Sequence, residues 1–140
     1  MQQPDFKTMP KHFMVCFSNS CPLRDDCLRS IVARSNRHTD EILVAVNPAL
    51  CEGKTCRHYR PNRTTTMAYG MVDSFHEVKA DDISALRETL ISHFGKGSYY
   101  LRRNGRRPIT PKEQAYISSV FKRFGYQVAF DRLEEETEWI

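Results

Sequence analysis

The sequence has no long hydrophobic run. Its longest apolar stretch, Ile42 to Val46, spans five residues, whereas a membrane-spanning helix needs about 20. Residues 1–13 also lack the basic start and apolar stretch that are typical of a signal peptide. We therefore expect a cytoplasmic protein with no membrane partner, whose thiols stay reduced. The odd number of cysteines, five, also argues against a framework of disulfides.

Catalytic motifs are missing as well. The sequence contains no phosphate-binding P-loop, no dinucleotide-binding glycine pattern, no H-E-x-x-H zinc motif and no G-x-S-x-G nucleophile motif. The "GKGS" at residues 95–98 follows a predicted helix, whereas a P-loop follows a strand, so it does not predict a phosphate site. The sequence therefore favours a protein that is not an enzyme.

Charge is present but unevenly distributed. The last ten residues, "DRLEEETEWI", contain five acids and one base, although the whole chain has a net charge of +4. Residues 1–130 therefore hold 20 bases and 12 acids, a net charge of +8. A basic body with an acidic tail indicates a polyanionic or acidic partner.

The order of predicted elements, α-β-β-α-β-β-α-β, is typical of an α+β fold. A length of 140 residues suits a small single domain, in which a mixed or antiparallel sheet packs against two or three helices. Within it we expect a cysteine-rich metal-binding part (1–60), an α+β part (61–130) and an acidic tail (131–140).

The helices have the clearest local signals. Thr110-Pro111-Lys112-Glu113 is a capping box with proline at the first helical position. A second helix begins near Asp81 or Asp82 and ends at Gly95. A third begins at Pro22 and ends near residues 35–36.

The strand signals come from apolar and β-branched residues. Residues 41–46 predict a buried strand, residues 64–72 a second strand, and the alternating residues 126–130 a last strand. Residues 98–109 are a hairpin candidate, because Asn104-Gly105 is a pair that two-residue turns prefer.

The cysteines cluster in two segments. Four residues separate Cys16 from Cys21, five separate Cys21 from Cys27, and Cys51 and Cys56 follow downstream. A structural zinc site needs four thiolate or imidazole ligands, and this chain supplies four thiols with one to spare. An iron–sulfur cluster is the alternative metal centre. We favour zinc, because no flavin or nucleotide motif accompanies the thiols.

Two other interpretations of the cysteines remain open at this point. In the first, the cysteines are buried small hydrophobic residues, since free cysteine is among the most buried residue types. In the second, His58, two residues after Cys56, replaces one thiol as a ligand.

Two stretches are basic and contain no acid. "GKGSYYLRRNGRRPI" and "GKTCRHYRPNR" supply guanidinium groups that match phosphate oxygens, and tyrosines that stack on unpaired bases. The predicted nucleic-acid-binding residues are Arg57, Arg60, Lys96, Tyr99, Tyr100, Arg102, Arg103, Arg106 and Arg107. The alternatives are a solvated hairpin edge, cations neutralised by the acidic tail, and an acidic protein partner.

Three motifs carry a resemblance: "CFSNSCPLRDDCLR", "CRHYRP" and "YYLRRNGRRPITPKEQAYI". With the Trp-ended acidic tail, they resemble a group of short uncharacterised Bacteroidetes proteins classed as a domain of unknown function. The resemblance runs from about residue 13 to residue 139 and implies a compact bacterial domain without an assigned activity. It also implies that Cys16, Cys21, Cys27 and Cys56 are the metal ligands and that Cys51 is the spare thiol.

The sequence therefore predicts a small metal-stabilised binding module that contacts nucleic acid, with RNA as first candidate, through a basic hairpin. An adaptor within a larger protein assembly is the second function class. An iron–sulfur redox protein is the third.

Overall fold

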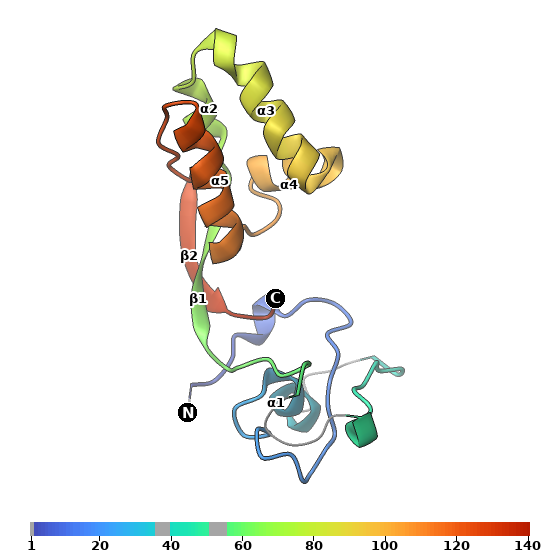
Figure 1. The fold of residues 1–140 in the computed structure, drawn as a ribbon. Helices are drawn as coiled ribbons and strands as arrows, with labels where there is room; N and C mark the ends of the chain where they lie inside the picture. The colour runs from blue at the N-terminus through green and yellow to red at the C-terminus, as the bar shows by residue number, and fades with distance from the viewer. Residues whose placement is uncertain (1, 36–39, 51–55) are drawn as a thin grey trace. The chain divides into compact units, whose positions relative to one another are not determined.

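The computed structural model describes residues 2–35, 40–50 and 56–140, which form two compact units. The first unit comprises Met1–Thr64 and Glu136–Ile140, and the second comprises Thr65–Glu135. The elements in chain order are η1 (Phe6–Thr8), α1 (Leu28–Arg34), η2 (Pro48–Leu50), β1 (Thr64–Tyr69), α2 (Val72–His76), α3 (Ala80–Phe94), α4 (Lys96–Arg103), α5 (Pro111–Arg123) and β2 (Arg132–Thr137) (Figure 1). The predicted α+β class is confirmed.

The two strands form an antiparallel ribbon. The N–H of Asp131 donates to the carbonyl of Gly70, and that of Glu138 donates to the carbonyl of Arg63, each at 2.9 Å. Pairs that run in opposite chain directions define antiparallel pairing. The β-branched start of β1 explains its strand conformation. The predicted strand at residues 64–72 is confirmed as far as Tyr69, whereas Val72 begins α2.

β2 replaces the predicted last strand. It lies within the predicted acidic tail, whereas residues 126–130 form no strand. The side chains of Tyr126, Val128 and Phe130 instead pack against the buried core as an irregular segment. Alternating apolar residues thus reflect burial on one side here, without strand pairing.

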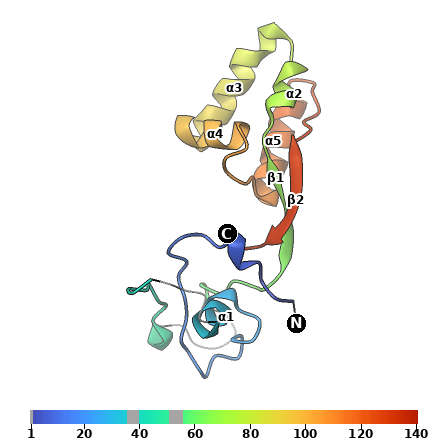
Figure 2. The same ribbon diagram turned by 180° about the vertical axis from the view of Figure 1, so that it is seen from behind.

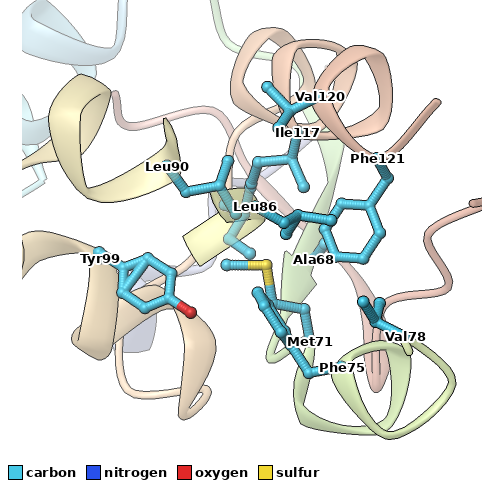
Figure 3. Packing of buried hydrophobic residues seen from close by; sticks show 11 residues of the cluster. Ala68, Met71, Phe75, Val78, Leu86, Leu90, Tyr99, Ile117, Val120 and Phe121 are labelled. Carbon is cyan, nitrogen blue, oxygen red and sulfur yellow. The ribbon is translucent and has the colours of Figure 1, made fainter. Parts of the chain in front are cut away.

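Helices α3, α4 and α5 pack around the core of the second unit. α3 contacts both α4 and α5, and the helices lie on one side of the ribbon in both views (Figures 1 and 2). The buried cluster consists of Ala68, Met71, Phe75, Val78, Leu86, Leu90, Tyr99, Ile109, Ile117, Val120 and Phe121 (Figure 3). Burying each large apolar side chain contributes about 1.5–3 kcal/mol to folding.

The capping box of α5 and the glycine end of α3 are confirmed, whereas the predicted N-cap of α3 at Asp81 or Asp82 is wrong, because Lys79 is the N-cap. The Thr110 side chain accepts a hydrogen bond from the Glu113 N–H, and the Glu113 carboxylate accepts one from the Thr110 N–H. α3 begins one residue before the predicted acids, which stand in its first turn, and it ends at Gly95. Gly95 has a φ of +86°, a conformation that only glycine adopts without strain.

The first unit is less regular. α1 begins at Leu28 with Cys27 as its N-cap, six residues later than predicted from Pro22. Before it the chain makes turns, in which the N–H of Arg24 bonds to the Cys21 carbonyl and that of Asp26 to the Leu23 carbonyl. The buried residues of this unit are Val15, Leu28, Val32, Ala33 and Trp139.

The predicted buried strand at residues 41–46 is wrong. Only Ala45 forms a bridge there, in parallel with Val15, and the side chains of Ile42 and Val44 are 87% and 59% exposed. A run of apolar residues indicated burial, but among the described residues the pairing does not extend beyond this single bridge. The predicted loop at residues 51–56 lies mostly outside the described residues.

No helix among the described residues is both long enough and apolar enough to cross a membrane.

Candidate nucleic-acid interface

The basic stretch predicted as a hairpin is a helix. α4 spans Lys96–Arg103, and Gly95 serves as its N-cap while also ending α3. The N–H of Asn104 closes the helix on the Tyr100 carbonyl at 3.0 Å, and Gly105 then takes a φ of +75°. Asn-Gly favours positive φ at the end of a helix as well as in a hairpin turn. The dipeptide therefore correctly predicted that the chain reverses at Asn104-Gly105, but it did not distinguish a helix end from a hairpin turn.

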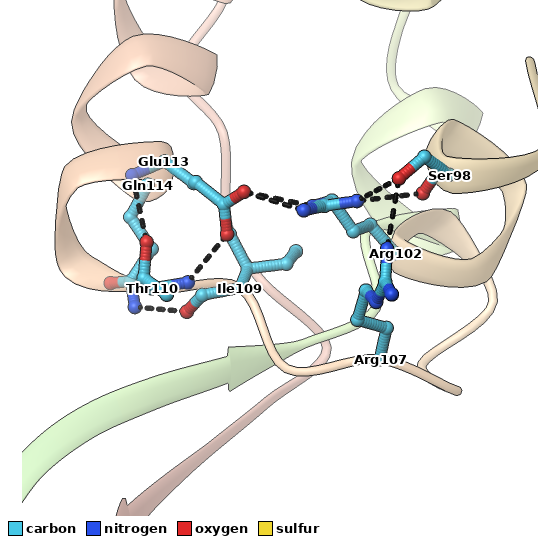
Figure 4. Close-up of polar contacts among 7 residues, drawn as sticks. All are labelled: Ser98, Arg102, Arg107, Ile109, Thr110, Glu113 and Gln114. Atoms are coloured by element: carbon cyan, nitrogen blue, oxygen red, sulfur yellow. Dashed lines mark hydrogen bonds and ion pairs between the residues drawn. The ribbon is translucent and has the colours of Figure 1, made fainter. Parts of the chain in front are cut away.

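Arg102 is held inside the second unit. Its guanidinium donates to the Glu113 carboxylate at 2.6 Å and to the Ser98 hydroxyl at 2.6 Å (Figure 4). It also lies 4.6 Å from the centre of the Phe94 ring, and its side chain is only 11% exposed. Arg102 thus joins the end of α4 to the start of α5, and its donors are engaged within the fold.

The contacts of Glu113 lower the pKa of its carboxyl group. Burial alone would raise its pKa, but the hydrogen bonds from Arg102 and Thr110 outweigh burial and hold the pKa of Glu113 below its usual value. Glu113 is therefore a carboxylate at neutral pH. Since it is the one acid among residues 96–123, which include eight bases, the segment has a net charge of +7.

Four of the predicted cations remain on or near the surface of the second unit, and we call them the α4 basic cluster: Lys96, Arg103, Arg106 and Arg107. Arg107 donates to the Ser98 hydroxyl at 3.0 Å, and Arg103 donates to the Asn104 side chain at 3.3 Å. In the part of the chain that the structure describes, none of the four forms an ion pair with a carboxylate.

The two predicted tyrosines differ in access. Tyr99 is fully buried in the core and cannot stack on a base at the surface. Tyr100 is half-buried, and its ring meets that of Tyr99 edge to face at 4.9 Å. Of the two tyrosines, only Tyr100 is accessible for the predicted stacking on a base.

The acidic tail, which contains β2, forms its polar contacts with residues of the ribbon and of the adjoining segments. Glu135 accepts a hydrogen bond from Thr66, Glu134 forms an ion pair with Arg132 at 2.9 Å, and Glu138 pairs with Arg63. These contacts lie within the ribbon and the segments that adjoin it. The described contacts of the tail therefore do not neutralise the α4 basic cluster.

Arg57 and Arg60 belong to the first unit. Arg57 is exposed and lies 3.4 Å from the ring nitrogen of His58. Arg60 is half-buried, and its backbone carbonyl accepts a hydrogen bond from the N–H of Leu28. These two residues are thus part of a separate unit from the α4 basic cluster.

The four cysteines in the described ranges do not form a metal centre. Cys16, Cys21, Cys27 and Cys56 line one small cavity of about 30 Å³. No group of three or more His, Cys, Asp or Glu residues in the described ranges is arranged to hold a metal ion.

The predicted zinc cofactor and its iron–sulfur alternative are therefore wrong, and so is the metal-stapled segment. The thiols share the cavity wall with Leu23, Val46 and Pro48, whereas a zinc ion needs four ligand atoms that converge at about 2.0–2.3 Å. Close spacing in sequence brought the thiols to one cavity without this convergence. Cys51 lies outside the described residues.

A pocket that the sequence did not reveal lies between α2, α3 and α4, with a volume of about 350 Å³. Its lining includes Phe75, Ile83, Arg87, Tyr99, Tyr100 and Arg103. Arg87 stands in a helix that begins with acids, so its sequence context held no signal of a cationic site. Only the packing of α3 against α4 places it near Arg103.

One comparison with known proteins gives a match. The model of a family of unknown function (DUF6078) matches residues 1–139. The chain belongs to this family. The DUF6078 match confirms the predicted membership of a family of unknown function, and it extends over both units. No curated protein and no solved structure matches the chain. The DUF6078 family assigns no activity to the α4 basic cluster, so a function has to be argued from the geometry.

Proposed function

We propose that the chain is a nucleic-acid-binding module, with RNA as the first candidate, that contacts phosphates through the α4 basic cluster. The observation that carries this proposal is a concentration of cations without acidic partners. Residues 96–123 have a net charge of +7, and their one acid is bound to Arg102. Neutralising phosphates with such cations releases counterions and supplies most of the affinity in non-specific nucleic-acid binding.

The arrangement of the cluster suits a phosphate backbone. Lys96 and Arg103 are seven residues apart, two helical turns, and so share one face of α4. Arg106 and Arg107 follow in the turn, where both N–H groups bond to the Leu101 carbonyl. Arginine matches phosphate oxygens with two parallel hydrogen bonds, which fixes orientation as well as affinity.

The scaffold under the cluster is rigid. The Arg102–Glu113 ion pair fixes α4 to α5, and the buried Tyr99 anchors α4 in the core. Cations on a preorganised helix lose less conformational freedom when they bind phosphate than cations on a mobile loop. This supports a binding role better than a purely solubilising one.

The test measures binding of labelled single-stranded RNA and DNA oligonucleotides of 20 nucleotides by fluorescence anisotropy, between 50 and 200 mM salt. The triple variant Lys96→Ala, Arg106→Ala, Arg107→Ala removes only exposed cations. We expect it to weaken binding at least tenfold at 50 mM salt and to reduce the slope of log K against log salt by about 2, since each single-strand phosphate contact adds about 0.7.

The matched control is the triple variant Lys7→Ala, Lys11→Ala, Lys79→Ala, which removes the same charge from exposed positions elsewhere. It should bind within about twofold of the unchanged protein at 50 mM salt, because it removes no phosphate contact of the cluster. Equal losses in both variants would show a diffuse charge effect and sink the proposed interface. Absence of any binding at 50 mM salt would sink the function itself, and would leave an acidic protein partner for these cations.

A further inference from the structure

We propose that the pocket between α2, α3 and α4 receives one unpaired nucleotide, with its phosphate on Arg87 and Arg103 and its base against Tyr100, so that the module selects single strands. This inference rests on the proposed function and deepens it. The pocket volume of about 350 Å³ falls within the range of about 300–1,000 Å³ that small-molecule sites occupy.

The first observation is an unpartnered hydroxyl. Tyr99 is 0% exposed, and its hydroxyl oxygen is buried without a hydrogen-bond partner among the described residues. Buried hydroxyl groups in native proteins are nearly always hydrogen-bonded, and exceptions call for an explanation such as a missing ligand. Since Tyr99 also lines the pocket, the proposal assigns the missing partner to the bound nucleotide.

The hydroxyl is suited to this role at neutral pH. Burial raises the pKa of Tyr99 to about 12, so the group keeps its proton and both donates and accepts a hydrogen bond. Its ring lies at the α4 edge of the buried cluster (Figure 3) and meets the Phe75 ring at 6.3 Å with an angle of 87°. Aromatic neighbours on two sides hold the ring in place.

The second observation is a pair of guanidinium groups from different helices. Arg87 on α3 and Arg103 on α4 both line the pocket, and the positive charges of both act on the Tyr99 hydroxyl. Neither forms an ion pair with a described carboxylate. Two guanidinium groups without carboxylate partners on one pocket are suited to an anion, because phosphate can accept hydrogen bonds from both.

The remaining wall is mostly aromatic and apolar. Phe75, Ile83 and Tyr100 line the pocket beside the two arginines, and His76 is a further polar residue of its lining besides Tyr99. Aromatic side chains stack on bases of any sequence, whereas a base that is paired within a duplex is not accessible to such a wall. An anion-binding site next to a stacking surface therefore favours an unpaired nucleotide over a free inorganic anion and over a duplex.

Arg103 links the pocket to the α4 basic cluster, because it belongs to both. A strand whose phosphates contact Lys96, Arg106 and Arg107 can therefore continue into the pocket on the same helix. This continuity makes a nucleotide of a bound strand a better occupant than the acidic side chain of a protein.

The first experiment titrates the full chain, labelled with ¹⁵N, with AMP and with inorganic phosphate, and follows the amide resonances by NMR. We expect AMP to shift the amides of Arg87, Tyr99, Tyr100 and Arg103 in a saturable manner, and phosphate to shift them at least fivefold more weakly. Tyr99→Phe keeps the ring but removes the hydroxyl, and should weaken AMP binding at least threefold. Arg123→Ala removes an exposed cation on α5 outside the pocket and should leave AMP binding unchanged.

The second experiment compares a single-stranded RNA with a blunt RNA duplex of the same length. The unchanged protein should prefer the single strand at least tenfold, and Arg87→Ala should reduce single-strand binding while duplex binding stays constant. If RNA binds without a strand preference, or if AMP leaves the pocket amides unshifted, the pocket assignment is overturned while the proposed function stands. If AMP binds but no RNA does, the proposed function and the single-strand selection both fail.

Discussion

The two units of this chain reach stability by different means. The second unit buries eleven residues between packed helices and one side of a β-ribbon, whereas the described cluster of the first unit has five buried residues and one seven-residue α-helix. Small cores leave little margin over the conformational entropy of the chain. The first unit adds contacts between the two ends of the chain.

These contacts join the two ends of the chain. The N–H of Asp5 donates to the Thr137 hydroxyl at 2.8 Å, and the indole N–H of Trp139 donates to the Thr8 hydroxyl at 3.0 Å. The Trp139 ring also meets the Phe13 ring at 5.0 Å. The C-terminal residues therefore complete the core of a unit that is otherwise built from the first 64 residues.

The strongest test of this comparison removes one large aromatic side chain from each core. Phe121→Ala in the second unit and Trp139→Ala in the first should each cost about 3–5 kcal/mol of unfolding free energy locally. Because each residue contacts the core of its own unit, hydrogen exchange should rise mainly in the unit that carries the substitution. Native-state hydrogen exchange, resolved by residue, measures both effects.

The matched control for Trp139 is Ile140→Ala, since Ile140 is the next residue but is 55% exposed. It should change the free energy of unfolding by no more than about 0.5 kcal/mol. If Trp139→Ala destabilised both units equally, the units would unfold as one, and the comparison drawn above would fail.

The same comparison explains which elements could be predicted. α5 and the end of α3 followed from local signals, because a capping box and a glycine at positive φ act within a few residues. β2 could not be predicted, because its acidic residues have no apolar alternation and its partner β1 lies about 60 residues earlier. Pairing over such distances is decided by the fold as a whole.

The candidate site shows a similar division. Composition located the cations, but it could not separate the internal Arg102 from the unpaired Arg103, because only packing brings Glu113 to Arg102. The buried hydroxyl of Tyr99 and its neighbour Arg87 had no sequence signal. The metal-site prediction was wrong for another reason. Spacing reports proximity along the chain, whereas a metal site needs ligand atoms that converge in space.

The next prediction concerns the ion pair between α4 and α5. Arg102→Ala leaves the partly buried Glu113 without its charge partner and should cost about 1–3 kcal/mol of unfolding free energy. Arg106→Ala is the control, because Arg106 is exposed and has no recorded ion pair in the described ranges. Thermal denaturation of both variants at pH 7 measures the difference. A loss no larger than that of the control would mean that this pair does not hold the helices together.

The ion pair also predicts a pH dependence. The folded-state pKa of Glu113 is lowered, so its contribution to stability is complete above the unfolded value of about 4.3 and is lost as the pH falls through the folded pKa. Thermal melts should therefore show an unfolding free energy that stays level down to about pH 5 and falls below it, with a smaller fall in Glu113→Gln. In the first unit, the hydrogen bond from Arg63 lowers the pKa of Glu138 in the same direction. Arg63 is largely exposed, so solvent screening should make the effect of Glu138→Gln the smaller of the two.

The smallest predicted loss of stability concerns the N-cap of α5, and it separates local capping from core packing. Thr110→Ala removes the side chain that accepts a hydrogen bond from the Glu113 N–H, and loss of such a cap costs about 0.5–2 kcal/mol. Thr110→Ser keeps the hydroxyl and should retain most of the stability, which separates the hydrogen bond from the lost methyl group. Residue-resolved hydrogen exchange should show faster exchange at the start of α5, with the amides of α1 in the first unit unchanged. Faster exchange in α1 would mean that a cap confined to one unit governs the other, and the two units would then have to be treated as a single cooperative structure.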